Sequence, residues 1–177
     1  MTMWNETIFL DTLSHLAREY ACIKTSEIPF RRYVVDACAM NYCGQYGKTW
    51  QCPPGIGDFE DLQKECLSYE NAVVFTTCHS IEDSFDIEGM NEGRKAHEKT
   101  TDEVLRLFLD KKIKALSAEG CGLCKKCTYP TAPCRFPDQA RSSVEANGIS
   151  VVELAQNCGI HYKNGQNMVT YFTLILY

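Results

Sequence analysis

The segment CGLCKKCTYPTAPC, at residues 121–134, limits what this chain can fold into more than any other part of its sequence. It contains four cysteines, at Cys121, Cys124, Cys127 and Cys134. Two-residue gaps let successive thiolates turn towards one small object, while the backbone amides between them point at its sulfurs. We therefore expect this segment to fold around a bound group.

Length and composition exclude several classes of protein. The 177 residues suffice for one domain with a hydrophobic core, so we expect residues 1–177 to form a single metal-binding domain. A net charge of −5 gives no basic surplus for binding nucleic acid. The N-terminal residues lack the pattern of a secretory signal, and the longest apolar run is too short to cross a bilayer as a helix. We expect a soluble, cytoplasmic protein without a nucleic-acid or membrane partner.

The 11 cysteines are too many and too clustered to be incidental. Their number is odd and the sequence carries no export signal, so a disulfide framework is not expected in a reducing cytoplasm. Thiolates that bind a metal or a cluster are the better interpretation. We interpret three of the cysteines, Cys22, Cys66 and Cys158, as core or surface thiols outside any site.

Hydrophobic periodicity predicts an α/β fold, with α+β as the alternative: a single-domain sandwich of a mixed sheet with helices, whose cysteine-rich loops hold metal clusters. Helices are expected over residues 5–20, 59–69, 97–112 and 143–157. Extended segments are expected over residues 28–35, 72–78, 114–118 and 167–177. The sequence KNGQ before the last strand resembles a hairpin turn, which would make His161 and Tyr162 the start of its partner strand.

The first cysteine group favours a [4Fe–4S] cluster held by Cys121, Cys124, Cys127 and Cys134. The ferredoxin pattern has three residues before its fourth cysteine, whereas this chain has six. Zinc sites prefer two cysteine pairs separated by a longer finger, so zinc is the alternative and plain reduced thiols the next. Lys125 and Lys126 either offset the negative charge of a cluster or lie on an ordinary solvated surface.

A second group, Cys38, Cys43 and Cys52, lies in and next to a loop rich in glycine and proline. Such a loop buries little core but can wrap a cofactor. Three cysteines can leave one iron of a cluster free for substrate or solvent. The alternative is a fourth ligand from elsewhere, for which Cys78, His79 and Cys134 are candidates. Three buried small hydrophobic residues would explain the pattern without any metal.

Both groups together resemble an uncharacterised prokaryotic family of predicted metal-binding proteins (domain of unknown function family 2284). The resemblance rests on C-x4-C-x2-YG-x2-W-x-CPP at residues 38–54, on C-x2-C-x2-C followed by PCR-x-P at residues 121–137, and on ARSSVEANGISV at residues 140–151. Ser142 stands where the family pattern leads us to expect proline. The resemblance implies a cysteine-bound metal centre, with iron–sulfur favoured, and implies no known substrate.

The segment RSSVE has a physical interpretation of its own. Ser142 or Ser143 can cap a helix, with Glu145 near the capping-box position. For Arg135 and Glu145, a role in the metal site and an ordinary structural role are equally consistent with the sequence.

The sequence supports three functional hypotheses. The first is an electron-transfer or redox accessory protein with one or two [4Fe–4S] clusters and a redox partner protein. The second is an enzyme that binds a small-molecule substrate at an open iron of the group formed by Cys38, Cys43 and Cys52. The third is a zinc-stabilised interaction module without a redox role. No catalytic residue and no oligomeric state can be assigned from the sequence.

Overall fold

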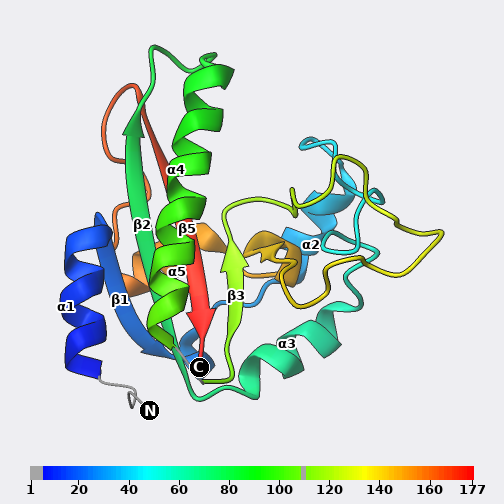
Figure 1. Cartoon of the computed structure of the whole chain (residues 1–177), viewed down its shortest axis with the longest axis horizontal. Helices are drawn as coiled ribbons and strands as arrows, with labels where there is room; N and C mark the ends of the chain where they lie inside the picture. Colours follow the sequence, from blue (N-terminus) through cyan, green and yellow to red (C-terminus); the bar gives the residue numbers. More distant parts are fainter. Residues whose placement is uncertain (1–5, 109–110) are drawn as a thin grey trace.

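The computed structural model describes residues 6–108 and 111–177. Within these residues the chain forms five α-helices and a five-stranded mixed sheet, which confirms the α/β class (Figure 1). The helices are α1 (Glu6–Leu16), α2 (Arg32–Ala39), α3 (Phe59–Leu67), α4 (Ile87–Leu105) and α5 (Val151–Cys158). The strands are β1 (Glu19–Lys24), β2 (Asn71–Ser80), β3 (Lys114–Ser117), β4 (Ser142–Ser143) and β5 (Met168–Leu176).

The sheet is built around β2 and β5, in the order β1-β2-β5-β3-β4. Neighbouring strands are antiparallel except β3 and β4, which are parallel. Residues 72–77 of β2 and 171–176 of β5 are buried on both faces of the sheet. Continuous apolar and β-branched runs of this kind are typical of central strands. By contrast, β1 alternates between intermediate and exposed residues, as expected of an edge strand.

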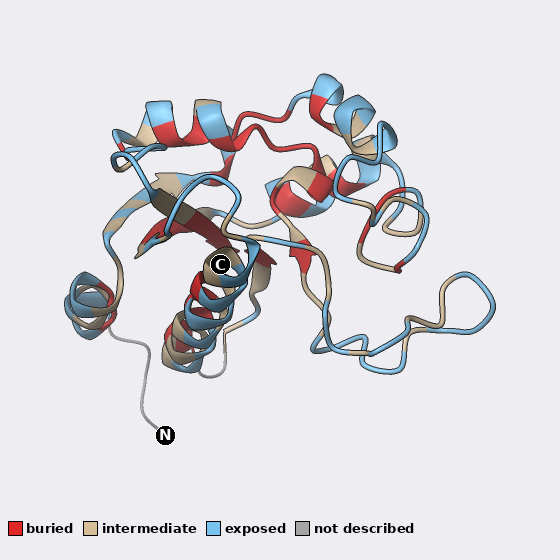
Figure 2. Ribbon diagram, turned by 90° about the horizontal axis from the view of Figure 1, so that it is seen from above, coloured by how far each residue is buried: buried red, intermediate tan, exposed pale blue. Residues whose placement is uncertain are grey.

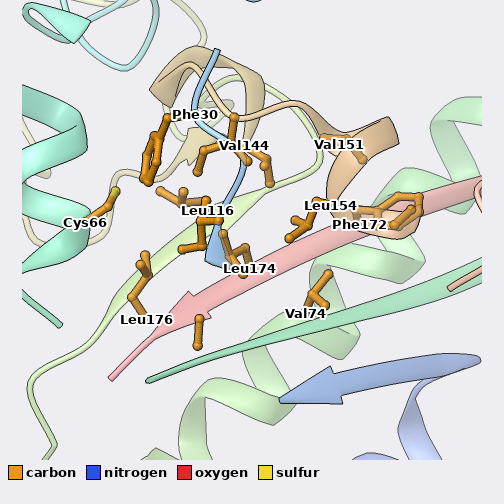
Figure 3. Packing of buried hydrophobic residues seen from close by; sticks show 14 of the residues in the cluster. Phe30, Cys66, Val74, Leu116, Val144, Val151, Leu154, Phe172, Leu174 and Leu176 are labelled. Carbon is orange, nitrogen blue, oxygen red and sulfur yellow. The ribbon is translucent and has the colours of Figure 1, made fainter. Parts of the chain in front are cut away.

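Two hydrophobic clusters pack on opposite faces of the sheet, because successive side chains of a strand point to opposite sides. On one face, Val73, Phe75 and Ile175 form a cluster with Phe9 of α1, Val104 of α4 and Phe108 of the 3₁₀ turn after α4. The alternate residues of the same strands pack against α5 and the segment before it (Figure 3); this cluster includes Val74, Leu174, Leu176, Ile149 and Leu154. Burial concentrates in the sheet and in the helix surfaces that face it (Figure 2).

The long loops at residues 40–58 and 118–141 contain no helix or strand. They gather beyond the β3 edge of the sheet, on the side away from β1 (Figure 1). They carry six of the seven predicted ligand cysteines, and the seventh, Cys38, lies in the last turn of α2. The sheet and its helices therefore form the support on which the cysteine loops are mounted.

Two predictions near the N-terminus are wrong in part. The helix predicted over residues 5–20 ends at Leu16, and strand β1 follows; residue 5 lies outside the described residues. The extended segment predicted over residues 28–35 becomes helical at Arg32, where α2 begins. The sequence of β1, EYACIK, does not alternate between apolar and polar residues although its burial alternates, and its strand conformation is stabilised by pairing with β2.

In the C-terminal half, the helix predicted over residues 143–157 is divided in two. A short 3₁₀ turn, η3 (Glu145–Asn147), ends at Gly148 with a φ of 73°, and α5 starts after it. The hairpin predicted at KNGQ is absent from the described structure: His161 and Tyr162 form no strand, and β5 pairs with β2 and β3 instead. The predicted helix at 97–112 belongs to α4, which starts earlier, at Ile87; residues 109–110 lie outside the described residues.

None of the helices in the described part of the chain is long and apolar enough to span a membrane.

Candidate metal centre

The four cysteines of the first group line a single cavity of about 540 Å³, together with residues from the loop that precedes α3. Four cationic side chains line the same cavity: Lys48, Lys125, Lys126 and Arg135. None of its lining residues in the described structure is Asp or Glu. The cavity therefore combines four thiols with a positive surround, which favours an anionic group held by thiolates.

Trp50 fastens the two long loops to each other beside this cavity. Its indole nitrogen donates a hydrogen bond to the carbonyl oxygen of Ala132 at 3.0 Å, and its ring meets that of Tyr129 edge to face, with centroids 4.9 Å apart. A methyl group on Gly55 would lie 2.7 Å from the Tyr129 ring, so this position has room only for glycine. Trp50 itself lines the first cavity and not the second.

The surroundings of Cys127 favour its thiolate form over its thiol form. Burial on its own would raise the pKa of Cys127, but backbone amides of Tyr129, Trp50 and Thr128 point at the sulfur, and Arg135 adds positive charge nearby. Together these effects hold the pKa of Cys127 below that of a free thiol. Amide hydrogen bonds to a ligating sulfur are one of the means by which proteins tune a cluster.

The second group, Cys38, Cys43 and Cys52, lines a separate cavity of about 580 Å³. Its charge is opposite to that of the first. Two carboxyl residues, Glu119 and Glu145, line this cavity, and no Lys or Arg is among its lining residues in the described structure. Three thiols and two carboxyl groups around one space form a donor set suited to a metal cation.

Burial and mutual repulsion act together on these thiols. Burial raises the pKa of Cys38, and the charges of Glu145, Cys43 and Cys52 raise it further. Burial also raises the pKa of Cys52, and the charges of Cys43, Cys121 and Cys127 raise it further. A bound cation would reverse this repulsion, because it stabilises the thiolate forms.

Cys52 lies at the boundary between the two sites. Its thiol interacts electrostatically with Cys43 of its own group and with Cys121 and Cys127 of the other. A methyl group on Gly120 would lie 3.0 Å from the Cys52 sulfur, so the chain passes Cys52 closely just before it reaches Cys121. The two sites are therefore neighbours.

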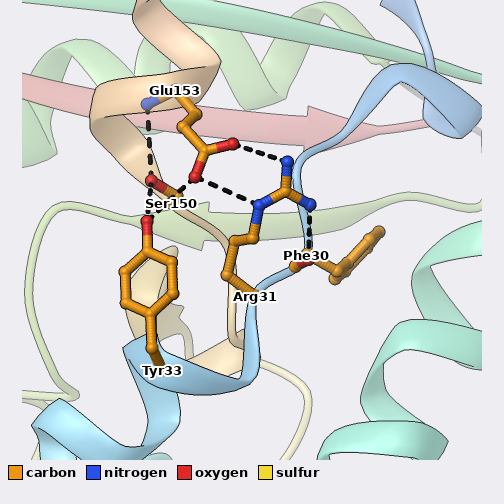
Figure 4. Close-up of polar contacts among 5 residues, drawn as sticks. All are labelled: Phe30, Arg31, Tyr33, Ser150 and Glu153. Atoms are coloured by element: carbon orange, nitrogen blue, oxygen red, sulfur yellow. Dashed lines mark hydrogen bonds and ion pairs between the residues drawn. The ribbon is translucent and has the colours of Figure 1, made fainter.

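Helix α2, which carries Cys38, is tied to α5 by a polar cluster (Figure 4). Arg31 donates two hydrogen bonds to the Glu153 carboxylate, at 3.1 and 2.6 Å. The Tyr33 hydroxyl lies 2.9 Å from Glu153 Oε1 and 3.1 Å from the Ser150 hydroxyl. Paired Arg–carboxylate hydrogen bonds restrict the orientation of the two side chains as well as stabilising the contact. They therefore hold the start of α2 against α5 and help to position Cys38 in the last turn of α2.

Comparison with protein families supports a metal site. The model of a family described as predicted metal-binding protein (DUF2284) matches residues 21–177. The chain belongs to this family. The match confirms the resemblance stated from the sequence, and it spans both cysteine groups and Glu145. No curated protein and no solved structure matches the chain.

In the described structure, the cysteines of neither group are close enough together to bind a single metal ion. Within residues 6–108 and 111–177, no three His, Cys, Asp or Glu side chains are close enough together to hold a metal ion. Thiolates on a single zinc lie about 4 Å apart, because each Zn–S bond measures about 2.3 Å. The donor chemistry of both cavities fits a thiolate-bound group, and the volume of each leaves room for more than one atom.

The other candidates for a fourth ligand of the second site lie elsewhere. Cys78 and His79 are on β2 and line neither cysteine cavity; Cys78 accepts a hydrogen bond from Thr170, and His79 bonds to Thr77. Cys134 lines the first cavity. Sequence reasoning missed Glu119, although its place two residues before Cys121 was a usable signal.

The three cysteines left out of both groups line neither cysteine cavity. Cys66 is fully buried in the hydrophobic cluster beside Leu116 and Leu176, and burial raises its pKa to about 11. Cys22 is exposed on β1, and Cys158 is half-buried at the end of α5.

Proposed function

We propose that this chain is an iron–sulfur protein in which Cys121, Cys124, Cys127 and Cys134 hold a [4Fe–4S] cluster. One observation carries the proposal: these four thiols line one cavity together with four cationic side chains and no carboxylate. Four cysteine thiolates are the usual ligand set of such a cluster. The cationic surround and the amides aimed at Cys127 suit the negative charge that four thiolates bring to a bound cluster.

The same proposal gives the second group, Cys38, Cys43 and Cys52, a cluster of its own. The donors of its cavity support this cluster, since three thiols and two carboxyl groups meet there without a Lys or Arg among the described lining residues, and the [4Fe–4S] core that they would bind is cationic. Cys52 interacts electrostatically with thiols of both groups, so the two sites are close neighbours in this chain.

The function that follows is electron transfer, or a redox accessory role with a partner protein, in the cytoplasm. A bound cluster would supply one-electron chemistry. The protein residues would hold it, keep Cys127 in its thiolate form and balance charge through Lys48, Lys125, Lys126 and Arg135. A second candidate, an enzyme that binds a small substrate at the second site, is favoured by the count of three thiols in a cavity of about 580 Å³.

Metal analysis of anaerobically purified protein tests the proposal. We expect iron and acid-labile sulfide at about eight atoms each per chain if both sites hold cubanes, and little zinc. Cys124→Ser removes a ligand of the first site and should lower both values by about four. Cys158→Ser, which changes a thiol outside both cavities, is the matched control and should leave them unchanged. Zinc without iron and sulfide would overturn the proposal in favour of a structural zinc module.

The redox role and the enzymatic role differ in their response to small molecules. We expect the EPR spectrum of the reduced protein to be unaffected by a panel of small anions and thiols, as for a pure electron carrier. A spectrum that changes with one member of the panel, and does so only when Cys52 is intact, would favour the enzyme.

A further inference from the structure

The second cavity contains two carboxyl groups in addition to its three cysteines. Cys38, Cys43 and Cys52 share it with Glu119 and Glu145, and no Lys or Arg lines it in the described part of the chain. Acidic groups gathered in a partly buried space are costly unless a cation balances them. The first cavity shows the opposite arrangement, so this acidity is a property of the second site alone.

The two glutamates differ in their partners. Glu119 forms an ion pair with Arg94, in which the carboxylate oxygen lies 3.0 Å from the guanidinium Nε, and about half of its side chain is exposed. Glu145 has no ion pair with any described residue. Its carboxyl group interacts with the Ser143 side chain and with its own backbone amide. Glu145 is thus the carboxyl group of this cavity that pairs with no described cationic side chain.

The backbone holds Glu145 in place. It is the first residue of η3, which packs against α2 and therefore against the helix that carries Cys38. The Asn147 side chain donates to the Ser142 hydroxyl and to the Ser143 carbonyl, both at 2.8 Å. The Arg31 amide donates to the carbonyl of Gly148 at 2.7 Å, directly after the turn. A carboxyl group mounted on such a fixed turn is preorganised, as ligands of metal sites are.

We propose that Glu145 supplies a carboxylate ligand to an iron of the second site, alongside Cys38, Cys43 and Cys52. This inference rests on the proposed iron–sulfur function. It accounts for the donor count: three thiolates and one carboxylate complete the four ligands that a cubane takes from a protein. A less electron-donating ligand in place of a thiolate raises the reduction potential, as histidine does in Rieske centres. The second site should therefore have a higher potential with Glu145 as its fourth ligand than it would have with a fourth thiolate.

Substitutions at position 145, with Glu119 as the matched control, test this ligand in the full-length chain. Glu145→Ala should lose about one iron per chain and give the EPR signal of a three-iron cluster after mild oxidation. Glu145→Cys should keep the full iron content and lower the potential of the second site. Glu119→Gln changes the carboxyl group of the same cavity that is paired with Arg94, and it should keep the full iron content without a three-iron signal after mild oxidation.

The outcomes separate this inference from the proposed function. Wild-type protein without iron and sulfide overturns the proposed function. Wild-type protein with both, together with Glu145→Ala and Glu145→Gln variants of unchanged iron content, EPR spectrum and potential, overturns the role of Glu145 alone. Far-UV circular dichroism checks folding of each variant. If the alanine variant does not fold, the nearly isosteric Glu145→Gln and the Glu145→Cys exchange decide the question by the same readouts.

Discussion

His97 is an ionisable residue that the fold keeps uncharged. It has no exposed surface, and each ring nitrogen lies 2.8 Å from a threonine hydroxyl, that of Thr77 on one side and Thr173 on the other. Thr101 extends the chain of hydroxyls, 2.9 Å from Thr173. Burial, with a smaller contribution from the charge of His79, lowers the pKa of His97 to about 3. This polar network joins α4 to strands β2 and β5 at the centre of the sheet.

We predict that His97 makes the protein less stable as the pH falls from about 6.5 to about 3. Over this range the unfolded chain binds a proton at His97 that the folded chain does not, so acid favours unfolding. The free energy of unfolding should decrease by up to about 1.4 kcal/mol per pH unit from this residue. Urea titrations between pH 5 and 7 measure the slope.

The control for this prediction is His97→Gln, which lowers stability overall but removes the titrating group. Its unfolding free energy should depend less steeply on pH than that of the wild type. If the unfolding free energies of the two proteins change equally with pH, His97 is not the source of the pH dependence.

At the level of elements, the break between η3 and α5 is fixed by Gly148. Its φ of 73° lies in the left-handed region, and a methyl group there would come within 2.3 Å of the Phe59 ring and 3.2 Å of Val35. Phe59 begins α3 and Val35 lies in α2. One glycine thus lets three elements meet directly behind the second cysteine site.

Gly148→Ala should destabilise the protein by roughly 2–4 kcal/mol, because it adds backbone strain to overpacking against Phe59. Gly159→Ala is the matched control: its φ is 67°, but no atom lies within 4 Å of the added methyl group. Strain alone should cost about 1 kcal/mol there. Chemical denaturation of both variants measures the difference, and equal losses would contradict the packing role assigned to Phe59.

Across the whole molecule, the hydrophobic clusters and the cysteine loops are separate. The clusters pack on the two faces of the sheet, whereas the loops gather beyond its β3 edge (Figure 1). Metal binding contributes folding free energy where the ligands are. The stability of the loops should therefore depend on the bound group, while that of the sheet should not.

Removal of the metal under anaerobic conditions should free the loops without unfolding the sheet. Hydrogen exchange should show amides of residues 41–57 and 119–141 opening at close to zero free energy, as in mobile loops. Amides of β2 and β5, measured in the same sample, are the internal control and should keep the protection set by global unfolding. Loss of protection in both regions at once would show that the bound group stabilises the entire fold.

The sequence by itself determined the features that depend on neighbouring residues. The spacing of Cys121, Cys124 and Cys127 indicated one shared cavity, because two-residue gaps act through local backbone geometry. The apolar runs of β2 and β5 indicated buried strands, since burial on both faces leaves a continuous pattern. The metal-binding family was identified from the same local motifs.

Only the tertiary structure decided which distant segments meet. It made β1 a strand through pairing with β2, which the sequence of β1 does not predict because its apolar and polar residues do not alternate. It placed Glu119 and Glu145 in the cavity of Cys38, and Cys52 between the two sites, although these residues are far apart along the chain. Such contacts depend on how every element packs, because a local pattern fixes the direction of a side chain but not what lies opposite it.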